Sequence, residues 1–317
     1  MKKIAVGVDL GGTAIKAGLV NPQGKILRDT TVPAEANQGP THVIKQIIKS
    51  VHQLIDGSSY KKRDYAGIGV GSPGSVDLDG GTVKYPPNFP GWTVVRLGDA
   101  LHKEFGLHVE VDNDANAAAV GEAKLGAGIG HKDFIMVTLG TGVGGGLILN
   151  GKIFRGTFGG AGELGHITID YNGPLCNCGN HGCVEAYVGA KYLTQRAIEK
   201  VKRNRRSKIL SLAGNDTRRI DPKIISLAAR AGDATALDIL AETGRYLGIG
   251  LATVVNLLDV RVIIIGGGIA RAGKPLFNPI KESVRRHVLT PMKDGLEVLP
   301  AKLGNSAGIL GAAALVL

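Results

Sequence analysis

All three cysteines of this chain lie within eight positions, and a histidine precedes them closely. The spacing H-x9-C-x-C-x4-C is formed by His166, Cys176, Cys178 and Cys183. One histidine with three cysteines is a standard ligand set for tetrahedral Zn²⁺, and the intervening glycines and asparagines suit a loop folded tightly around an ion. A disulfide is the alternative, but a Cys-x-Cys bridge would be strained and the odd count leaves one thiol over. The spacing therefore predicts one structural Zn²⁺, with His181 inside the loop as the rival histidine ligand.

Glycine-rich turns follow three apolar runs of the chain, at DLGGT (9–13), LGTGVGGG (139–146) and IIIGGGIA (263–270). Glycine lets backbone amides approach a phosphate closely, and successive amides form anion-binding nests. Neither a Walker motif nor a Rossmann fingerprint is present, because GTGVGGG runs into a predicted strand rather than a helix. The three turns predict a nucleotide held from several sides. The alternative is that they are simply tight turns of an α/β domain.

Polar side chains at these turns could contact phosphate or its metal. Asp9 precedes the first turn, where it could face Mg²⁺ through water or start the turn as an Asx residue. Thr13 and Thr141 can donate hydroxyl hydrogens to phosphate oxygens. Lys16 either reaches phosphate or lies on the outer face of the following strand.

The elements around these residues alternate between strands and helices. Helical spacing predicts helices over 41–56 and 97–106, and small residues predict further helices over 115–126 and 306–317. The expected strands include 3–9, two strands joined at NPQG, 65–72 and 107–113, then 133–154 as strand, glycine turn, strand, turn, strand, and 260–266. The recurrence of the opening pattern about 130 residues later suggests a duplicated α/β unit with a cleft between the halves. The last helix is expected to pack back on the first half.

Composition indicates a globular protein with two domains. The chain has 317 residues, of which 44% are hydrophobic, and no apolar run is long enough to span a membrane. The basic start of the chain has too few apolar residues before Asp9 for a secretion signal, so a buried strand is expected there. We therefore expect a cytoplasmic protein with reduced thiols and no membrane partner.

The formal net charge of +11 suggests anionic partners. The densest basic cluster, KVKRNRRSK at 200–208, is expected to continue a helix and to form its solvated end rather than a nucleic-acid site. Aromatic residues make up only 4% of the chain, which leaves little for base stacking. No nucleic-acid partner is expected.

Taken together, these motifs resemble the ROK family of sugar kinases, within the actin-like ATPase (ribonuclease H-like) fold. Residues 9–13 resemble its first phosphate motif, 139–146 its second, 266–268 its adenosine motif and 176–185 its zinc signature. The motifs run in family order across nearly the whole chain. The resemblance implies an α/β protein with two α/β lobes around a cleft: a smaller lobe of residues 1–115 plus 306–317, and a larger lobe of residues 116–305.

The resemblance also implies roles for individual residues. Asn113 and Asp114 resemble the sugar-binding Asn and the catalytic Asp, which takes a proton from a sugar hydroxyl as a general base. The alternative for Asp114 is an N-cap of the following helix, although Asn113 or Asp112 could cap instead. The other sugar ligands that it implies are Glu163, His166, Glu185 and Asn88. The nucleotide-binding residues that it implies are Asp9, Gly11, Gly12, Thr13, Lys16, Thr141, Gly142, Gly266, Gly267 and Gly268.

Within the family, the chain most resembles bacterial glucokinases, which implies phosphorylation of glucose to glucose 6-phosphate with ATP and Mg²⁺. Kinases of fructose, mannose, allose or N-acetylated amino sugars are alternatives, as is polyphosphate as the phosphoryl donor. A sugar-sensing regulator without catalysis is a further alternative. Family regulators carry an added N-terminal DNA-binding segment, and this chain starts at the kinase strand. A homo-oligomer, dimer or tetramer, is expected.

Overall fold

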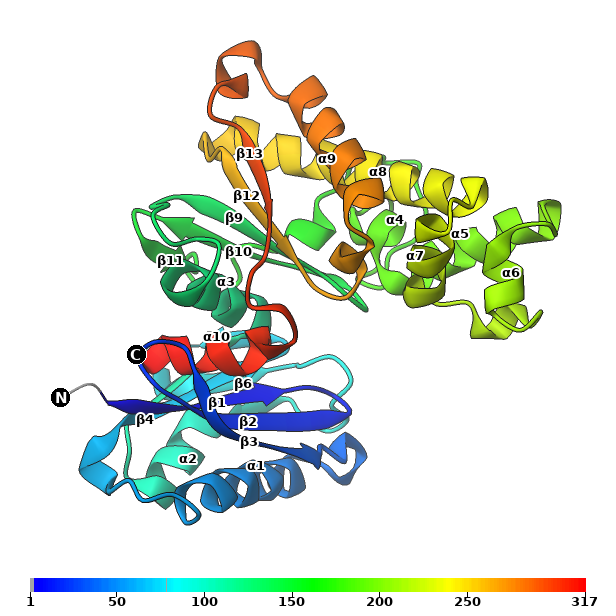
Figure 1. Ribbon diagram of the computed structural model, residues 1–317. Coiled ribbons are helices and arrows are strands. Elements are labelled where there is room, and N and C mark those ends of the chain that lie inside the picture. The colour runs from blue at the N-terminus through cyan, green and yellow to red at the C-terminus, as the bar shows by residue number, and fades with distance from the viewer. Residues whose placement is uncertain (1–2, 78) are drawn as a thin grey trace. The chain divides into compact units, whose positions relative to one another are not determined.

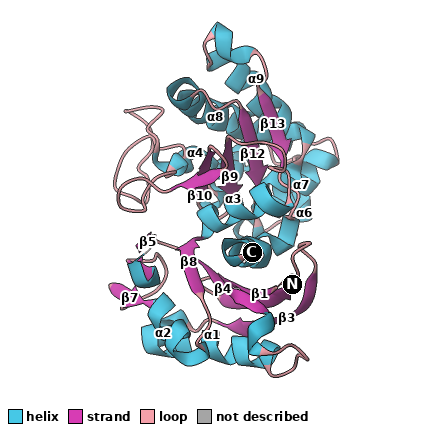
Figure 2. Cartoon of the chain, turned by 90° about the vertical axis from the view of Figure 1, so that its left-hand side faces the viewer, coloured by secondary structure: helices cyan, strands magenta, loops and turns pink. Residues whose placement is uncertain are grey.

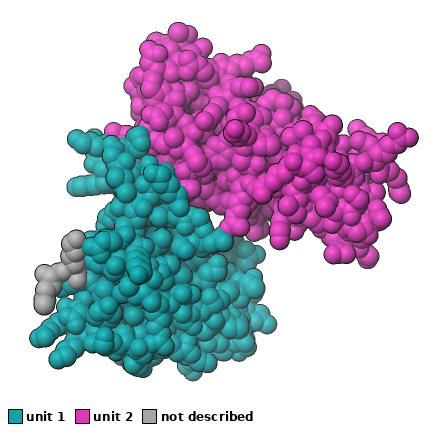
Figure 3. Space-filling view, in the orientation of Figure 1, with its two compact units in different colours: residues 1–132, 146–162, 302–317 teal, residues 133–145, 163–301 magenta. Residues whose placement is uncertain are grey.

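The computed structural model describes residues 3–77 and 79–317 of the chain. The chain divides into two compact units, coloured separately in Figure 3: unit 1 holds residues 1–132, 146–162 and 302–317, and unit 2 holds residues 133–145 and 163–301. Unit 1 extends past the expected boundary at residue 115, because the helix over residues 114–125 packs on the C-terminal helix of the same unit.

Unit 1 is built on a five-stranded sheet in the order β3-β2-β1-β4-β8. The first three strands form an antiparallel meander, whereas β4 and β8 run parallel to β1. The strands are β1 (Ile4–Leu10), β2 (Ala14–Val20), β3 (Ile26–Pro33), β4 (Tyr65–Ser72) and β8 (Val109–Asn113). The expected strands of the first half are therefore confirmed. A smaller sheet in the order β5-β6-β7 was not predicted; it comprises β5 (Ser75–Asp77), β6 (Thr82–Lys84) and β7 (Val94–Arg96).

Helices cover both faces of the five-stranded sheet. They are α1 (Pro40–Ile55), α2 (Leu97–Phe105), α3 (Asp114–Leu125) and α10 (Ala307–Val316). Alternate residues of β1 face opposite sides: Val6 joins the core with α1 and α2, whereas Ala5 packs against α10. Figures 1 and 2 show α10 on the face opposite α1 and α2. The helix approaches so closely that a Cβ added at Gly69 would lie 1.8 Å from the carbonyl oxygen of Ala312.

The second sheet, in the order β11-β10-β9-β12-β13, repeats the first strand for strand. Strand β12 is parallel to β9 and β13, whereas β10 and β11 are antiparallel. The strands are β9 (Phe134–Leu139), β10 (Val143–Leu149), β11 (Lys152–Phe154), β12 (Val262–Gly266) and β13 (Glu297–Pro300). The chain passes from unit 2 to unit 1 within β10, between residues 145 and 146. The predicted recurrence of strand, glycine turn and strand is confirmed by this shared order.

Unit 2 carries most of the remaining helices, with α8 and α9 packed along each other. They are α4 (Glu185–Val188), α5 (Ala190–Arg203), α6 (Lys208–Leu212), α7 (Pro222–Arg230), α8 (Ala234–Leu258) and α9 (Lys274–His287). The predicted continuation of α5 through residue 208 is wrong. Helix α5 ends at Arg203, and Ser207 starts α6 by accepting a hydrogen bond from the amide of Ile209. Among the described residues, no helix is both long and apolar enough to cross a membrane.

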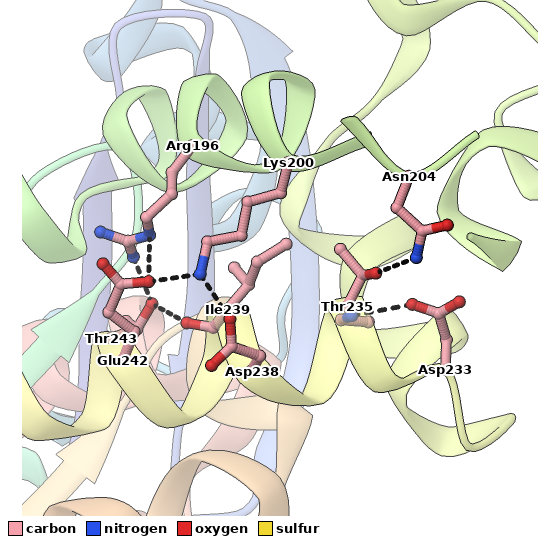
Figure 4. A network of polar contacts seen from close by, with 10 residues as sticks. Arg196, Lys200, Asn204, Asp233, Thr235, Asp238, Ile239, Glu242 and Thr243 are labelled. Carbon is pink, nitrogen blue, oxygen red and sulfur yellow. Dashed lines mark hydrogen bonds and ion pairs between the residues drawn. The ribbon is translucent and has the colours of Figure 1, made fainter. Parts of the chain in front are cut away.

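A polar network joins α5 to α8 (Figure 4). The ammonium group of Lys200 pairs with Asp238 and lies 2.7 Å from Oε2 of Glu242. One turn earlier, Nη2 of Arg196 donates to Oγ1 of Thr243 at 2.6 Å. The first cation of the basic segment is thus paired within unit 2, and residues 202–206 are exposed, as expected for a solvated helix end.

Candidate active site and metal cluster

The corner between β8 and α3 places Asn113 and Asp114 at the carboxyl end of a central strand. The side-chain oxygen of Asn113 accepts from the amides of Ala115 at 2.9 Å and Asn116 at 3.3 Å. Its Nδ2 donates to the carbonyl oxygen of Gly74 at 3.1 Å. Asn113 is therefore the N-cap of α3, which decides between the capping alternatives. Asp114 is the first helical residue and is exposed to solvent.

A buried carboxylate lies directly before this corner. Asp112 exposes 3% of its side chain, and its Oδ2 receives two bonds from Arg155, from Nε at 2.8 Å and from Nη2 at 2.7 Å. Its Oδ1 accepts from the amide of Asn113 at 2.8 Å and from Nδ2 of Asn116 at 3.0 Å. Arg155 was missed by the sequence reasoning, since it lies 43 residues away from Asp112 and belongs to no motif.

The first glycine turn joins β1 to β2 in unit 1. The amide of Gly11 donates to the carbonyl oxygen of Ala14 at 3.1 Å, which closes the turn. Asp9 and Lys16 are directly opposite each other in the antiparallel pair, so their side chains share one face of the sheet. Burial raises the pKa of Asp9, and the charge of Lys16 offsets part of that rise. Lys16 is therefore on the Asp9 face rather than the opposite one.

Two further residues border the first turn. Asn88 adopts a left-handed backbone conformation, with φ of 66°. A Cβ added at Gly12 would lie 3.4 Å from the Cβ of Asn88, so the two residues are neighbours. Thr13 accepts a bond from the amide of Ala34 through its carbonyl oxygen, while its side chain is exposed. Asn88 thus lies beside the expected phosphate turn within unit 1.

The second and third glycine turns lie together in unit 2. Gly267, with φ of 91°, approaches the backbone of Leu139 so closely that an added Cβ would lie 2.2 Å from its carbonyl oxygen. Gly268, next along, has open space on its Cβ side. Leu139 also leads into the second turn, where Gly140 accepts a bond from the amide of Ala190 at the start of α5. The structure therefore brings the expected nucleotide residues 141–142 and 266–268 to one region of unit 2.

The predicted metal ligands form a cluster in unit 2. One ligand atom from each of His166, Cys176, Cys178 and Cys183 lies within 4.8 Å of all the others. Nδ1 of His166 is 3.7 Å from Sγ of Cys176, and the Sγ atoms of Cys178 and Cys183 are also 3.7 Å apart. In a tetrahedron with Zn–S bonds of about 2.3 Å, ligand atoms lie roughly 3.8 Å apart. The geometry of the cluster fits such a site.

Two observations bear on which groups would bind an ion. His181 directs Nδ1 to the carbonyl oxygen of Gly173 at 3.0 Å and is not in the cluster, so His166 is the histidine of the group. Burial raises the pKa of Cys183 to about 12. Its thiolate form therefore requires a compensating positive charge, which a bound divalent cation supplies.

Glu185 connects the cluster to the second glycine turn. Its Oε2 accepts from the amide of Val143 at 2.9 Å, and its Oε1 lies 3.8 Å from Sγ of Cys176. A Cβ added at Gly142 would lie 2.4 Å from Oε2, so any larger residue there would require this carboxylate to move. Glu163 is exposed and begins the short 3-10 turn that ends at His166.

An aromatic pair, missed by the sequence reasoning, supports the helix that carries Glu185. The ring of Tyr187 stacks on Tyr246 of α8 with centroids 4.1 Å apart, and its hydroxyl donates to Oδ2 of Asp170 at 3.0 Å. The sequence offers no signal for this contact, because Tyr246 lies 59 positions after Tyr187 in the chain. The stack fixes α4 against the body of unit 2.

Comparison with known proteins places this arrangement in a family. The pattern that defines the ROK family matches residues 5–317. The chain is 40% identical to a glucokinase of Thermotoga maritima over 98% of its own length and 96% of that protein, and 38% identical to a glucokinase of Streptomyces coelicolor over 98% and 96%. It is also 32% identical to the xylose repressor of Bacillus subtilis, over 99% of its own length and 77% of the repressor.

The fold is shared with solved structures. A ROK family glucokinase from Streptomyces griseus, in complex with glucose and AMPPNP, superposes with a TM-score of 0.86 at 39% identity, covering 98% of both chains. A ROK hexokinase from Thermus thermophilus superposes with a TM-score of 0.81 at 33% identity, covering 98% of this chain and 97% of the other. The predicted actin-like ATPase fold class is thereby confirmed. From its sequence pattern and its relatives alike, the chain belongs to the ROK family.

Proposed function

We propose that this protein is an ATP-dependent glucokinase that transfers the γ-phosphoryl group of ATP to the 6-hydroxyl of glucose. The observation that carries the proposal is the Asn113–Asp114 corner, in a chain 40% identical to a glucokinase over nearly its whole length. The Streptomyces griseus relative with glucose and AMPPNP bound supports the choice of both substrates.

Asp114 is the proposed general base. Its carboxylate takes the proton of the 6-hydroxyl as that oxygen attacks the γ-phosphorus, and ADP leaves. Asn113 holds the corner, because both of its acceptor bonds go to α3 and one Nδ2 hydrogen goes to Gly74. The second Nδ2 hydrogen is the proposed donor to a sugar hydroxyl. A donor fixed in this way needs no reordering when sugar arrives.

The glycine turns are the proposed phosphate and nucleotide contacts. The amides of Gly12 and Gly142 would donate to phosphate oxygens, and the open side of Gly268 leaves room for an adenosine. Thr13 and Thr141 are exposed at the first and second turns and can add hydroxyl bonds.

Asp9 is the residue that would hold Mg²⁺, an ion that prefers oxygen ligands and keeps several waters. Burial raises the pKa of Asp9, and a bound cation would offset this rise by stabilising the ionised carboxylate. When bound, Mg²⁺ supplies charge neutralisation for the phosphates. Lys16, on the same face as Asp9, can add a second positive charge.

The cluster of His166 and the three cysteines is the proposed site of one structural Zn²⁺. Thiolate ligands favour Zn²⁺ over Mg²⁺, and four protein ligands leave no position for a reactive water. Because Nδ1 of His166 faces the cluster, Nε2 is the nitrogen left for a sugar hydroxyl. Glu163 and Glu185 flank the ligands, and their carboxylates are the proposed acceptors for further hydroxyls.

A sugar-sensing regulator is the second candidate, favoured by the similarity to xylose repressors. Turnover distinguishes the two, because a sensor binds sugar without consuming ATP. The purified protein would be mixed with glucose, MgATP and a coupled glucose 6-phosphate dehydrogenase, and polyphosphate would replace ATP in a parallel assay. We expect ADP and glucose 6-phosphate in equal amounts with ATP. If no hexose in a panel gives ADP above background, the kinase proposal fails.

The Asp114→Asn variant tests the base. Loss of a general base costs about 10²–10⁴-fold in rate, while the variant should fold and bind glucose. Turnover near that of the wild type in a folded Asp114→Asn protein would remove Asp114 from this role. A homo-oligomeric state remains a prediction, to be checked by light scattering.

A further inference from the structure

We propose that Arg155 is a positioning residue for the Asn113–Asp114 corner, acting through the carboxylate of Asp112. This inference rests on the proposed function, in which Asp114 is the general base. Arg155 belongs to none of the sequence motifs and follows directly after β11, in a segment of unit 1.

The contact itself is an ion pair between a partly exposed arginine and a buried carboxylate. Nε and Nη2 of Arg155 lie 2.8 and 2.7 Å from the same oxygen of Asp112, Oδ2. The side chains are 26% and 3% exposed, respectively. A guanidinium carries a permanent charge and directs its hydrogens in a fixed fork, so it sets the rotation of the carboxylate as well as neutralising it.

The other oxygen of Asp112, Oδ1, is hydrogen-bonded to the start of α3, so the orientation of the carboxylate affects the position of that helix end. It accepts from the amide of Asn113 and from the side chain of Asn116, the residues on either side of the first helical residue, Asp114. Asn116 is 2% exposed, and within the described residues its Oδ1 has no hydrogen-bond partner. The bond to Asp112 is therefore the polar contact that orients the Asn116 side chain.

The backbone of Arg155 is also anchored by contacts outside α3. Its carbonyl oxygen accepts from the amide of Ala161 at 3.1 Å, which closes the loop that follows β11. The loop rests on β5, because a Cβ added at Gly159 would lie 2.3 Å from the carbonyl oxygen of Val76. The backbone of Arg155 is therefore held in place, and its guanidinium can hold Asp112 in one orientation. Without it, an uncompensated buried carboxylate would remain beside the corner and would be expected to turn away.

Four variants test the role: Arg155→Met, Arg155→Lys, Asp112→Asn and the double variant Asp112→Asn/Arg155→Met. The matched control is Arg218→Met, because Arg218 is 89% exposed and pairs with its near neighbour Asp216. For each protein, kcat and the KM values for glucose and ATP are measured, together with the thermal midpoint. Rates are expressed per folded molecule.

We expect Arg155→Met to lower kcat by roughly 10–100-fold, since a small misplacement of a catalytic group can cost about 10² in rate. The KM for ATP should stay within about twofold, because the phosphate turns are untouched. Arg155→Lys should recover part of kcat, and the double variant should lose no more than its worse single variant, as coupled residues do. Arg218→Met should match the wild type.

An unchanged kcat in folded Arg155→Met, with only a lower thermal midpoint, would overturn the inference, and so would strictly additive losses in the double variant. If Arg155→Met does not fold, Arg155→Lys decides, because full kcat in that variant would show that the fork does not matter. None of these outcomes contradicts the proposed function, provided that the wild type is active and the Asp114→Asn variant is inactive. An inactive wild type would instead remove the proposed function itself.

Discussion

Oε2 of Glu185 accepts a hydrogen bond from the amide of Val143 at 2.9 Å. One carboxylate, two residues after the last cysteine of the metal cluster, thereby holds the backbone of the second glycine turn. Its other oxygen lies 3.8 Å from Sγ of Cys176. The proposed zinc site and the proposed phosphate turn therefore contact the same side chain. We expect a substitution of Glu185 to change the affinity for both glucose and the nucleotide.

The first prediction concerns this shared role. Glu185→Ala should weaken binding of AMPPNP as well as glucose, because the turn loses its support and the sugar loses an acceptor. Glu185→Gln keeps an acceptor oxygen for the Val143 amide, so its AMPPNP affinity should stay near that of the wild type. Calorimetric titration of each ligand measures both. The control is Glu199→Ala, an exchange at a glutamate on α5 away from the turn. Unchanged AMPPNP affinity in Glu185→Ala would show that the Val143 contact is dispensable.

The second prediction concerns the contact between β4 and α10. Gly69→Ala should destabilise the protein, because the new methyl group would lie 1.8 Å from the Ala312 carbonyl oxygen and the helix must move. Overpacking of this kind typically costs about 1–3 kcal/mol. Chemical denaturation measures the loss against Gly160→Ala, where the added Cβ meets open space. Equal stability of the two variants would mean that α10 can shift without cost.

Local signals allowed much of this fold to be predicted. Each glycine turn follows an apolar run, so the paired strands around residues 11–13 and 140–142 could be recognised from the sequence. Helix α1 shows a clear helical period, and its predicted and observed bounds differ by one residue at each end. The metal cluster could be predicted because its ligands are rare residue types at short spacing.

Contacts set by tertiary packing could not be predicted. Nothing in the sequence relates Arg155 to Asp112, since the strands that bring them together are distant in the chain. The strands β5, β6 and β7 have three residues each, too few for a periodic pattern. The capping choice at α3 also needed the structure, because Asp112, Asn113 and Asp114 are all competent N-caps by residue type.

The third prediction concerns the pH dependence of stability at Asp9. Burial raises the pKa of this carboxyl from 3.8, so the folded protein holds the proton more tightly than the unfolded chain. The free energy of unfolding therefore falls as pH rises from about 3.8 through the raised pKa. At neutral pH the ionised Asp9 destabilises the folded protein. Without ligands at pH 7, Asp9→Asn should melt at a higher temperature than the wild type.

The gain should shrink as pH falls through the raised pKa of Asp9, because the carboxyl then becomes neutral in the wild type too. MgATP should raise the melting temperature of Asp9→Asn less than that of the wild type, because the proposed metal contact is gone. Thermal scans at several pH values measure both effects, with Asp29→Asn on the exposed strand β3 as the control. A lower melting temperature for Asp9→Asn at pH 7 would contradict the assignment.

The last prediction concerns metal removal. Protein purified without chelator should contain about one Zn²⁺ per chain, and Cys178→Ala should reduce this to less than about a tenth of an equivalent. The loop should then lose its order, and because Glu163 and Glu185 flank the ligands, glucose binding should be lost before AMPPNP binding. Asn177→Ala is the matched control, since its side chain contacts Lys191 rather than the cluster. Elemental analysis that finds no zinc in the wild type would reject the site. If zinc-free Cys178→Ala retains its affinity for glucose, glucose binding does not depend on the metal.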